Sequence, residues 1–306
     1  MSHIYNLQPS RLDGTETVFD HMKYRTFQFP ETFDLRPQCP PVYDQGNEGS
    51  CTANAGVFAR VMLFIQNLFP KVTEEEAILL SRAFLYYMER YLEGDTDRDA
   101  GASMKDIGEA LKEFGVCRDS EMPYVAGDYQ TAPSDTAKQE ALAYKIAGAS
   151  MIREIDGIKT ALVSQNQPVL VGMTVYESLE SDRVARTGVL PMPKAWEQEL
   201  GGHAVAIVGY LPALPDETRR KLHPLLAGKS AEKAGKYTCL NKIIKKLIDI
   251  LFKEKASGYF IVRNSWGKDW GDGGYFYMPY EYVTRGFADE FWILENLAAP
   301  SSSKAG

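Results

Sequence analysis

Cys51 is the cysteine whose sequence surroundings best suit a nucleophile. It follows a Gly-Ser turn and opens a stretch with apolar residues every three or four positions, which predicts a helix ending before Pro70. A helix N-terminus lowers a thiol pKa and favours the reactive thiolate. Cys117 instead follows a predicted helix C-terminus, Cys39 lies in a proline-bounded loop and Cys239 in a lysine-rich segment. Local reasoning leaves two roles open for Cys51, a reactive thiol and an inert thiol at a helix start.

A histidine base for this cysteine is selected by elimination. His3 and His21 lie in a polar N-terminal stretch and His223 in the lysine-rich segment, whereas His203 begins an apolar stretch that predicts a strand to Tyr210. An imidazole takes up a proton near neutral pH and activates a thiol beside it. A histidine at a strand end is often structural, so this pattern also leaves both roles open.

Three motifs, in order, resemble those of the papain-like (C1 family) cysteine peptidases, which include the cathepsins. The Cys51–His203 separation is close to that of the family, and the resemblance covers roughly residues 31–297. The motifs are Gln45-Gly46-x-x-Gly49-Ser50-Cys51, Gly202-His203-Ala204-Val205, and Asn264-Ser265-Trp266-Gly267 followed by Trp270-Gly271-x-x-Gly274-Tyr275.

The resemblance implies a definite set of catalytic roles. Cys51 would be the nucleophile, His203 the base and then the acid, and Asn264 the residue that orients His203. The Gln45 side chain and the Cys51 backbone N–H would bind the oxyanion. Trp266 would shield the His203–Asn264 hydrogen bond from water. No metal or organic cofactor is implied.

Residues that bind substrate are also implied by the resemblance. Gly101 and Ala102 match the family's pair of residues that binds extended substrate backbone, and Gly202 precedes the histidine. Counted without gaps from Asn264, Glu290 falls where the cathepsin B type has an acid at the base of the S2 pocket, which predicts bulky apolar side chains or arginine at P2. A surface glutamate is the alternative. No counterpart of the cathepsin B occluding loop is visible, so endopeptidase action is expected.

The expected fold is α+β, a papain-like structure with a helical lobe, a β-barrel-like lobe and the active-site cleft between them. We expect the helical lobe at 31–135, the β lobe at 136–297 and a C-terminal tail at 298–306. The periodicity predicts helices at Glu74–Glu93 and Ser103–Phe114, and strands at Gln167–Tyr176, His203–Tyr210, Gly258–Arg263 and Gly274–Met278.

Two segments fall outside the resemblance. Residues 1–30 form a polar arm, either a short self-inhibiting pro-segment of a zymogen or a surface tail. Residues 211–257 form an insertion with an amphipathic stretch at 240–252, for which a helix capping the β lobe is favoured over membrane or effector contact. The insertion lengthens the His203–Asn264 separation beyond the usual family spacing, so the role of Asn264 requires that the insertion loops out of the fold.

Composition restricts the partners and the cellular compartment that are expected. A net charge of -7 disfavours nucleic acid as a partner. Four widely spaced cysteines and the lack of a basic, apolar leader favour a cytoplasmic or otherwise reducing compartment, with signal-independent export left open. Glu48 stands where secreted relatives carry a disulfide cysteine. Two alternative functions remain: a catalytically silent papain-like binding module, and a Cys–His acyltransferase or deubiquitinase-like enzyme.

Overall fold

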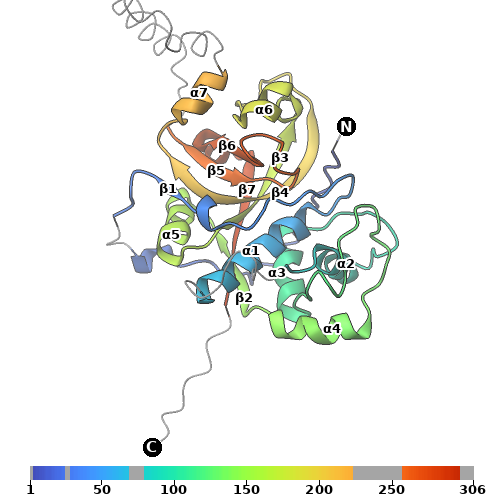
Figure 1. Cartoon of the computed structure of the whole chain (residues 1–306). Coiled ribbons are helices and arrows are strands. Elements are labelled where there is room, and N and C mark those ends of the chain that lie inside the picture. The colour runs from blue at the N-terminus through green and yellow to red at the C-terminus, as the bar shows by residue number, and fades with distance from the viewer. Residues whose placement is uncertain (1–2, 25–27, 69–78, 223–256, 297–306) are drawn as a thin grey trace, which may run out of the picture.

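The computed structural model describes residues 3–24, 28–68, 79–222 and 257–296. Within these ranges, the helices of residues 51–141 gather on one side of the molecule, and an antiparallel sheet with further helices around it forms the other side (Figure 1). This is the α+β arrangement expected from the sequence. The helices of the first side are α1 (Cys51–Leu68), α2 (Arg82–Glu93), α3 (Met104–Glu113) and α4 (Asp135–Ala141).

The sheet in the described part of the chain has seven strands in the order β2-β7-β3-β4-β5-β6, with β1 paired to β4. Its strands are β1 (Phe33–Asp34), β2 (Gly148–Ile152), β3 (Val169–Tyr176), β4 (Glu199–Leu211), β5 (Tyr259–Arg263), β6 (Tyr275–Pro279) and β7 (Ala288–Glu295). Short helices connect them: η1 (His21–Tyr24), η2 (Arg36–Gln38), η4 (Leu142–Tyr144), α5 (Ile155–Gln165), η5 (Glu177–Glu180), α6 (Asp182–Thr187), α7 (Asp216–Leu222) and α10 (Tyr280–Thr284).

The core lies between α1 and the sheet, where α1 packs directly on β4. Every residue of β5 and β6 is buried, so these strands are continuous apolar runs rather than alternating ones. Arg263 is the buried exception. Its guanidinium donates to the carbonyl groups of Pro40 and Pro41 and lies over the Phe58 ring. The last residue of β5 therefore attaches the sheet to the loop that precedes the nucleophile.

Some element boundaries differ from the predicted ones. The helix expected to begin at Glu74 begins at Arg82. Ser81 caps its N-terminus by accepting a hydrogen bond from the Phe84 N–H, and the preceding residue Leu80 forms a β-bridge with Arg118. Residues 69–78 lie outside the described part of the chain. Strands β2 and β7 were not predicted, and β4 begins four residues before His203, at Glu199.

The 211–257 insertion leaves and re-enters the sheet at one point. Leu211, the last residue of β4, lies opposite Tyr259, the first residue of β5. Strands β4 and β5 are therefore paired neighbours although the inserted segment separates them in the sequence. The predicted amphipathic stretch 240–252 lies outside the described residues. No helix in the described ranges has the length and apolar character needed to span a membrane.

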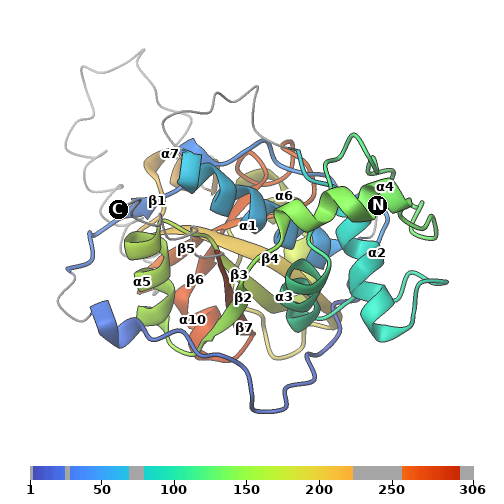
Figure 2. The ribbon, with the colours of Figure 1, turned by 90° about the horizontal axis from the view of Figure 1, so that it is seen from below.

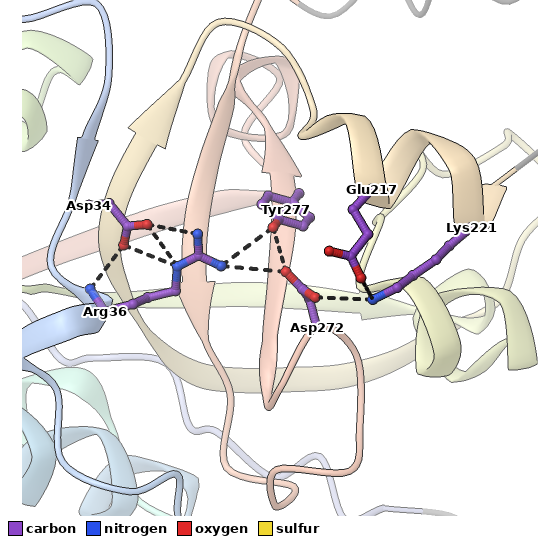
Figure 3. A network of polar contacts seen from close by, with 6 residues as sticks. All are labelled: Asp34, Arg36, Glu217, Lys221, Asp272 and Tyr277. Atoms are coloured by element: carbon purple, nitrogen blue, oxygen red, sulfur yellow. Dashed lines mark hydrogen bonds and ion pairs between the residues drawn. The ribbon is translucent and has the colours of Figure 1, made fainter. Parts of the chain in front are cut away.

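A polar network connects α7, which lies at the start of the inserted segment, to the sheet (Figure 3). Asp272, in the loop before β6, accepts from the Tyr277 hydroxyl at 2.6 Å and pairs with Arg36 at 3.4 Å and with Lys221 of α7 at 3.5 Å. Arg36 is also paired with Asp34 at the end of β1. The network joins β1, α7 and the loop that connects Asn264 to β6.

Candidate active site

Cys51 is the first residue of α1, and its side chain is completely buried. The loop before it is fixed to the β lobe through Gln45. The Gln45 backbone N–H donates to the Ser265 carbonyl at 2.9 Å, and the Ser265 hydroxyl donates to Gln45 Oε1 at 2.5 Å. Gln45 Nε2 donates to the Glu48 carbonyl at 2.8 Å. A primary amide has two N–H donors, so the second is left for an oxyanion.

His203 and Asn264 come from adjacent strands. His203 lies on β4 and Asn264 directly follows β5, and the two strands pair with Ala206 opposite Arg263. The His203 Nε2 and Asn264 Oδ1 atoms are 2.8 Å apart. The insertion therefore does not separate them, and the spacing concern raised by the sequence is resolved.

This hydrogen bond determines the tautomer of His203. Asn264 Oδ1 is an acceptor that also receives the Ser265 backbone N–H at 2.8 Å, so Nε2 of His203 carries the proton. Nδ1 of His203 is then the basic atom, and it is buried with no hydrogen-bond partner among the described residues. The Trp266 ring stacks on the imidazole, with centroids 5.1 Å apart and planes inclined by 21°.

Burial keeps the thiol and the imidazole neutral in this state. Burial raises the pKa of Cys51 to about 12, although a hydrogen bond from the backbone N–H of Ala204 opposes the rise. Burial lowers the pKa of His203 to about 4, against the opposing effect of its bond to Asn264. A thiolate–imidazolium pair is therefore disfavoured at neutral pH. A neutral thiol is a weak nucleophile, so burial disfavours reaction of Cys51 in the closed chain.

The N-terminal arm, dark blue in Figure 2, runs past both the helices and the sheet. It contributes to this burial, because it pairs with β4 next to His203 and its Tyr5 ring lies edge-on to the imidazole, with centroids 5.9 Å apart. Asn6 pairs in parallel with Gly202, and Gln8 with Ser103. The Leu7 N–H donates to the Gly202 carbonyl at 3.2 Å, and the Gln8 N–H donates to the Ala102 carbonyl at 2.9 Å. The arm thus occupies the two backbone edges at which the sequence predicted substrate to bind.

Glycine is required where the arm passes closest. A Cβ on Gly101 would lie 1.9 Å from the Asn6 carbonyl oxygen, and Gly101 has a φ of 74°. A Cβ on Gly202 would lie 3.0 Å from the Leu7 Cβ. Both glycines therefore admit an extended chain into the cleft, whether the arm or a substrate.

The Leu7 side chain lies in a pocket beside Gly172, Met104 and Glu290. A Cβ built on Gly172 would be 3.2 Å from both Leu7 Cδ2 and Met104 Cγ, and 3.4 Å from Glu290 Cβ. Glu290 lies on β7 opposite Gly172. Its Oε1 accepts the Ser10 backbone N–H at 3.3 Å. Glu290 therefore lies beside the arm residue Leu7, and its role in the S2 pocket stays a prediction.

On the other side of the dyad, His3 and Tyr5 hold the arm against a residue that sequence analysis missed. Glu180 of η5 accepts from the Tyr5 hydroxyl and lies 3.0 Å from His3 Nδ1. Partial burial raises the pKa of Glu180, but the hydrogen bonds from Tyr5 and His3 outweigh burial and leave it lowered. Glu180 belongs to no recognisable sequence motif. Its place in the site becomes apparent only from the path of the arm.

Asp99 is a second residue that the sequence analysis did not place in the site. Its carboxylate accepts the Gly49 backbone N–H at 3.0 Å and the Tyr86 hydroxyl, and its carbonyl accepts from Asn6 Nδ2 at 2.9 Å. Asp99 therefore joins the loop before Cys51 to the Gly101 edge of the cleft. Asp99 belongs to no motif of the family resemblance, so this contact had no sign in the sequence.

Two departures from the family motif are accommodated locally. Thr52, where the family usually has an aromatic residue, donates its hydroxyl to Glu89 at 2.6 Å, and complete burial raises the pKa of Glu89 well above its usual value. Glu48, in place of a disulfide cysteine, accepts the Gly127 N–H at 2.8 Å. Hydrogen bonds therefore hold both Thr52 and Glu48 in place.

Comparison with known proteins agrees with this geometry. The model of the papain family of cysteine proteases matches residues 29–215 and 238–292. An uncharacterized peptidase C1-like protein of Acanthamoeba polyphaga mimivirus is 32% identical over 96% of this chain and 78% of its own. Cathepsin B-like CP3 of Giardia intestinalis is 26% identical over 81% of this chain and 69% of its own.

Solved structures show the same fold. Xylellain, a cysteine protease from Xylella fastidiosa, superposes with a TM-score of 0.71 at 29% identity and covers 96% of each chain. A procathepsin B from Trypanosoma congolense gives a TM-score of 0.65 at 15% identity, over 96% of this chain and 87% of its own.

The chain therefore belongs to the papain family of cysteine peptidases. It is a hydrolase of the cysteine-peptidase type that acts on peptide or protein substrates, with the papain-like two-lobed fold.

Proposed function

We propose that the chain is a latent cysteine endopeptidase, a zymogen whose residues 3–10 block its own cleft. The observation that carries this proposal is the arm between Gly202 and Ala102, above a completely buried Cys51 and His203. Two of the structural neighbours are proforms of a ragweed pollen cysteine protease and of a Tenebrio molitor digestive procathepsin, in line with a self-blocking segment.

Departure of the arm returns water to the cleft and lets the dyad ionise. The Cys51 thiolate then attacks a peptide carbonyl, and the oxyanion accepts hydrogen bonds from the Gln45 side chain and the Cys51 backbone N–H. His203, charged at Nδ1 and held at Nε2 by Asn264, gives its proton to the leaving amine. His203 next takes a proton from water, which hydrolyses the thioester and regenerates the thiol.

The pocket that holds Leu7 supports the expected P2 preference. Its contacts with Met104 and Gly172 favour a bulky apolar side chain. Glu290 Oε2 is buried and has no hydrogen-bond partner in the described part of the chain, so it is placed to accept from an arginine. We propose leucine-like or arginine side chains at P2.

Replacing Glu290 by glutamine should lower cleavage of Z-Arg-Arg substrate relative to Z-Phe-Arg about tenfold. The loss of a charge-assisted hydrogen bond, worth about 1.5–3 kcal/mol, causes the change. Steady-state kcat/KM for both substrates provides the ratio. Asp289→Asn, an exposed neighbour on β7, is the matched control and should leave the ratio unchanged. An unchanged ratio in Glu290→Gln would exclude Glu290 from P2 selection.

The function itself is tested with fluorogenic Z-Phe-Arg under reducing conditions, in the full-length chain and in a Leu7→Asp chain with a disrupted arm. Turnover should appear in the Leu7→Asp chain and should be abolished by Cys51→Ala and by an epoxide thiol inhibitor. If neither chain turns over substrate and Cys51 is not labelled by the epoxide, the protein is a silent binding module instead.

A further inference from the structure

His3 of the arm occupies a small site made by an aromatic ring and a carboxylate. Its imidazole stacks on Trp266 with centroids 3.9 Å apart and planes inclined by 10°. The Nδ1 atom lies 3.0 and 3.2 Å from the two oxygens of Glu180, and the His3 backbone N–H reaches the same carboxylate at 3.4 Å. The ring of an arm residue is thus held by a flat apolar face and a negative group together.

This pair of groups matches one class of side chain. The face of an indole attracts cations, and a guanidinium or imidazolium also stacks flat on it. A carboxylate at the ring edge accepts two N–H groups from a planar fork, which lysine does not present. Since about a quarter of each side chain is exposed, His3 at 23% and Glu180 at 27%, solvent moderates the attraction without removing it.

The site lies across the dyad from the pocket of Leu7. Trp266 covers His203, the residue that protonates the leaving amine in the proposed reaction, whereas Leu7 lies beside Glu290 on the acyl side. Three arm residues, Ile4, Tyr5 and Asn6, separate His3 from Leu7. A substrate that places its P2 side chain in the Leu7 pocket therefore extends its leaving-group part toward Glu180 and Trp266.

We propose that Glu180 and Trp266 form a subsite that selects a planar basic side chain, arginine or histidine, within the first three residues after the cleaved bond. The proposal deepens the proposed peptidase function and rests on it. The arm fills this subsite with His3 and thereby also masks a specificity determinant of the open enzyme.

The test uses internally quenched peptides with leucine at P2 and a single arginine, histidine, lysine, alanine or glutamate at each of the three positions after the cleaved bond. The full-length Leu7→Asp chain is the enzyme, and the ratio of kcat/KM for arginine over alanine is the readout. A ratio of about tenfold is expected at the best position, equivalent to about 1.4 kcal/mol. Lysine should give a smaller ratio and glutamate a ratio below one.

Glu180→Gln should reduce the arginine ratio to less than about threefold, since a neutral amide removes the charge but keeps the shape. Because Glu180 lies close enough to His203 to influence it, the readout is the ratio within each enzyme and not the overall activity. Glu177→Gln, an exposed residue of the same short helix, is the matched control and should keep the ratio.

Equal cleavage of the arginine and alanine peptides, or a preference that survives Glu180→Gln, would overturn the subsite while leaving the peptidase intact. If the Leu7→Asp chain cleaves no peptide, the proposed function fails separately. The subsite is then judged by fluorescence anisotropy with labelled forms of the same peptides. Tighter binding of arginine than alanine that Glu180→Gln abolishes supports it, and equal dissociation constants reject it.

Discussion

Replacing Leu7 by aspartate should increase the rate at which iodoacetamide alkylates Cys51 at pH 7 by at least about 100-fold. Leu7 fills the pocket beside Glu290, and a carboxylate there would be buried next to a second carboxylate. The arm then leaves, and the Cys51 pKa falls from about 12 toward the range of an exposed thiol. Each pKa unit changes the thiolate fraction about tenfold well below the pKa.

The same prediction also fixes the direction in which the alkylation rate changes with pH. In the closed chain the thiolate forms only as pH rises toward about 12, so alkylation at neutral pH is slow. In the Leu7→Asp chain the alkylation profile should shift to lower pH. Leu12→Asp, at an arm residue that is 47% exposed, is the control and should react like the parent. Equal rates in the parent and the Leu7→Asp chain would show that the arm does not restrain Cys51.

Removing the Gln45 side chain from the Leu7→Asp chain should lower kcat about 100- to 1,000-fold with little change in KM. This is the usual effect of losing one donor to an oxyanion, because the donor acts mainly in the transition state. Steady-state kinetics on Z-Phe-Arg substrate measures both constants. Alkylation of Cys51 should stay close to that of the Leu7→Asp chain, since alkylation forms no oxyanion.

Gln139→Ala, an exposed glutamine of α4, is the matched control for general effects of the substitution. Thermal unfolding of the Gln45→Ala chain checks that the loop before Cys51 still folds, because Ser265 loses its side-chain partner there. A kcat within about threefold of the Leu7→Asp chain would remove Gln45 from the oxyanion site.

The sequence predicted the residues of the site better than the path of the chain around it. Cys51, His203, Asn264 and Gln45 belong to local motifs with turn glycines and helix-start signals. The structure bonds His203 to Asn264, Gln45 to Ser265 next to Asn264, and Cys51 to Ala204 next to His203. Their catalytic roles remain predictions that the substitutions above test. Recognition was possible because each motif combines a reactive side chain with the local backbone geometry that orients it.

The elements that were missed depend on distant contacts. Strand β7 carries the apolar run Phe291-Trp292-Ile293-Leu294, which is buried on both faces and so has no alternation to reveal a strand. The arm has no periodicity because it is stabilised by pairing with Gly202 and Ser103, far away in the sequence. Glu180 and Asp99 became visible only after that pairing placed their partners beside them.

The pairing of Leu211 with Tyr259 has a consequence for how this enzyme can vary. The two ends of the inserted segment are held side by side by the sheet itself, so the closure of that loop is already enforced whatever its length. The entropic cost of a longer loop grows only logarithmically, by about 0.6 kcal/mol per doubling. The end of β4 is therefore a natural attachment point, where sequence can be exchanged, extended or replaced by another module while His203 and Asn264 stay within hydrogen-bonding distance.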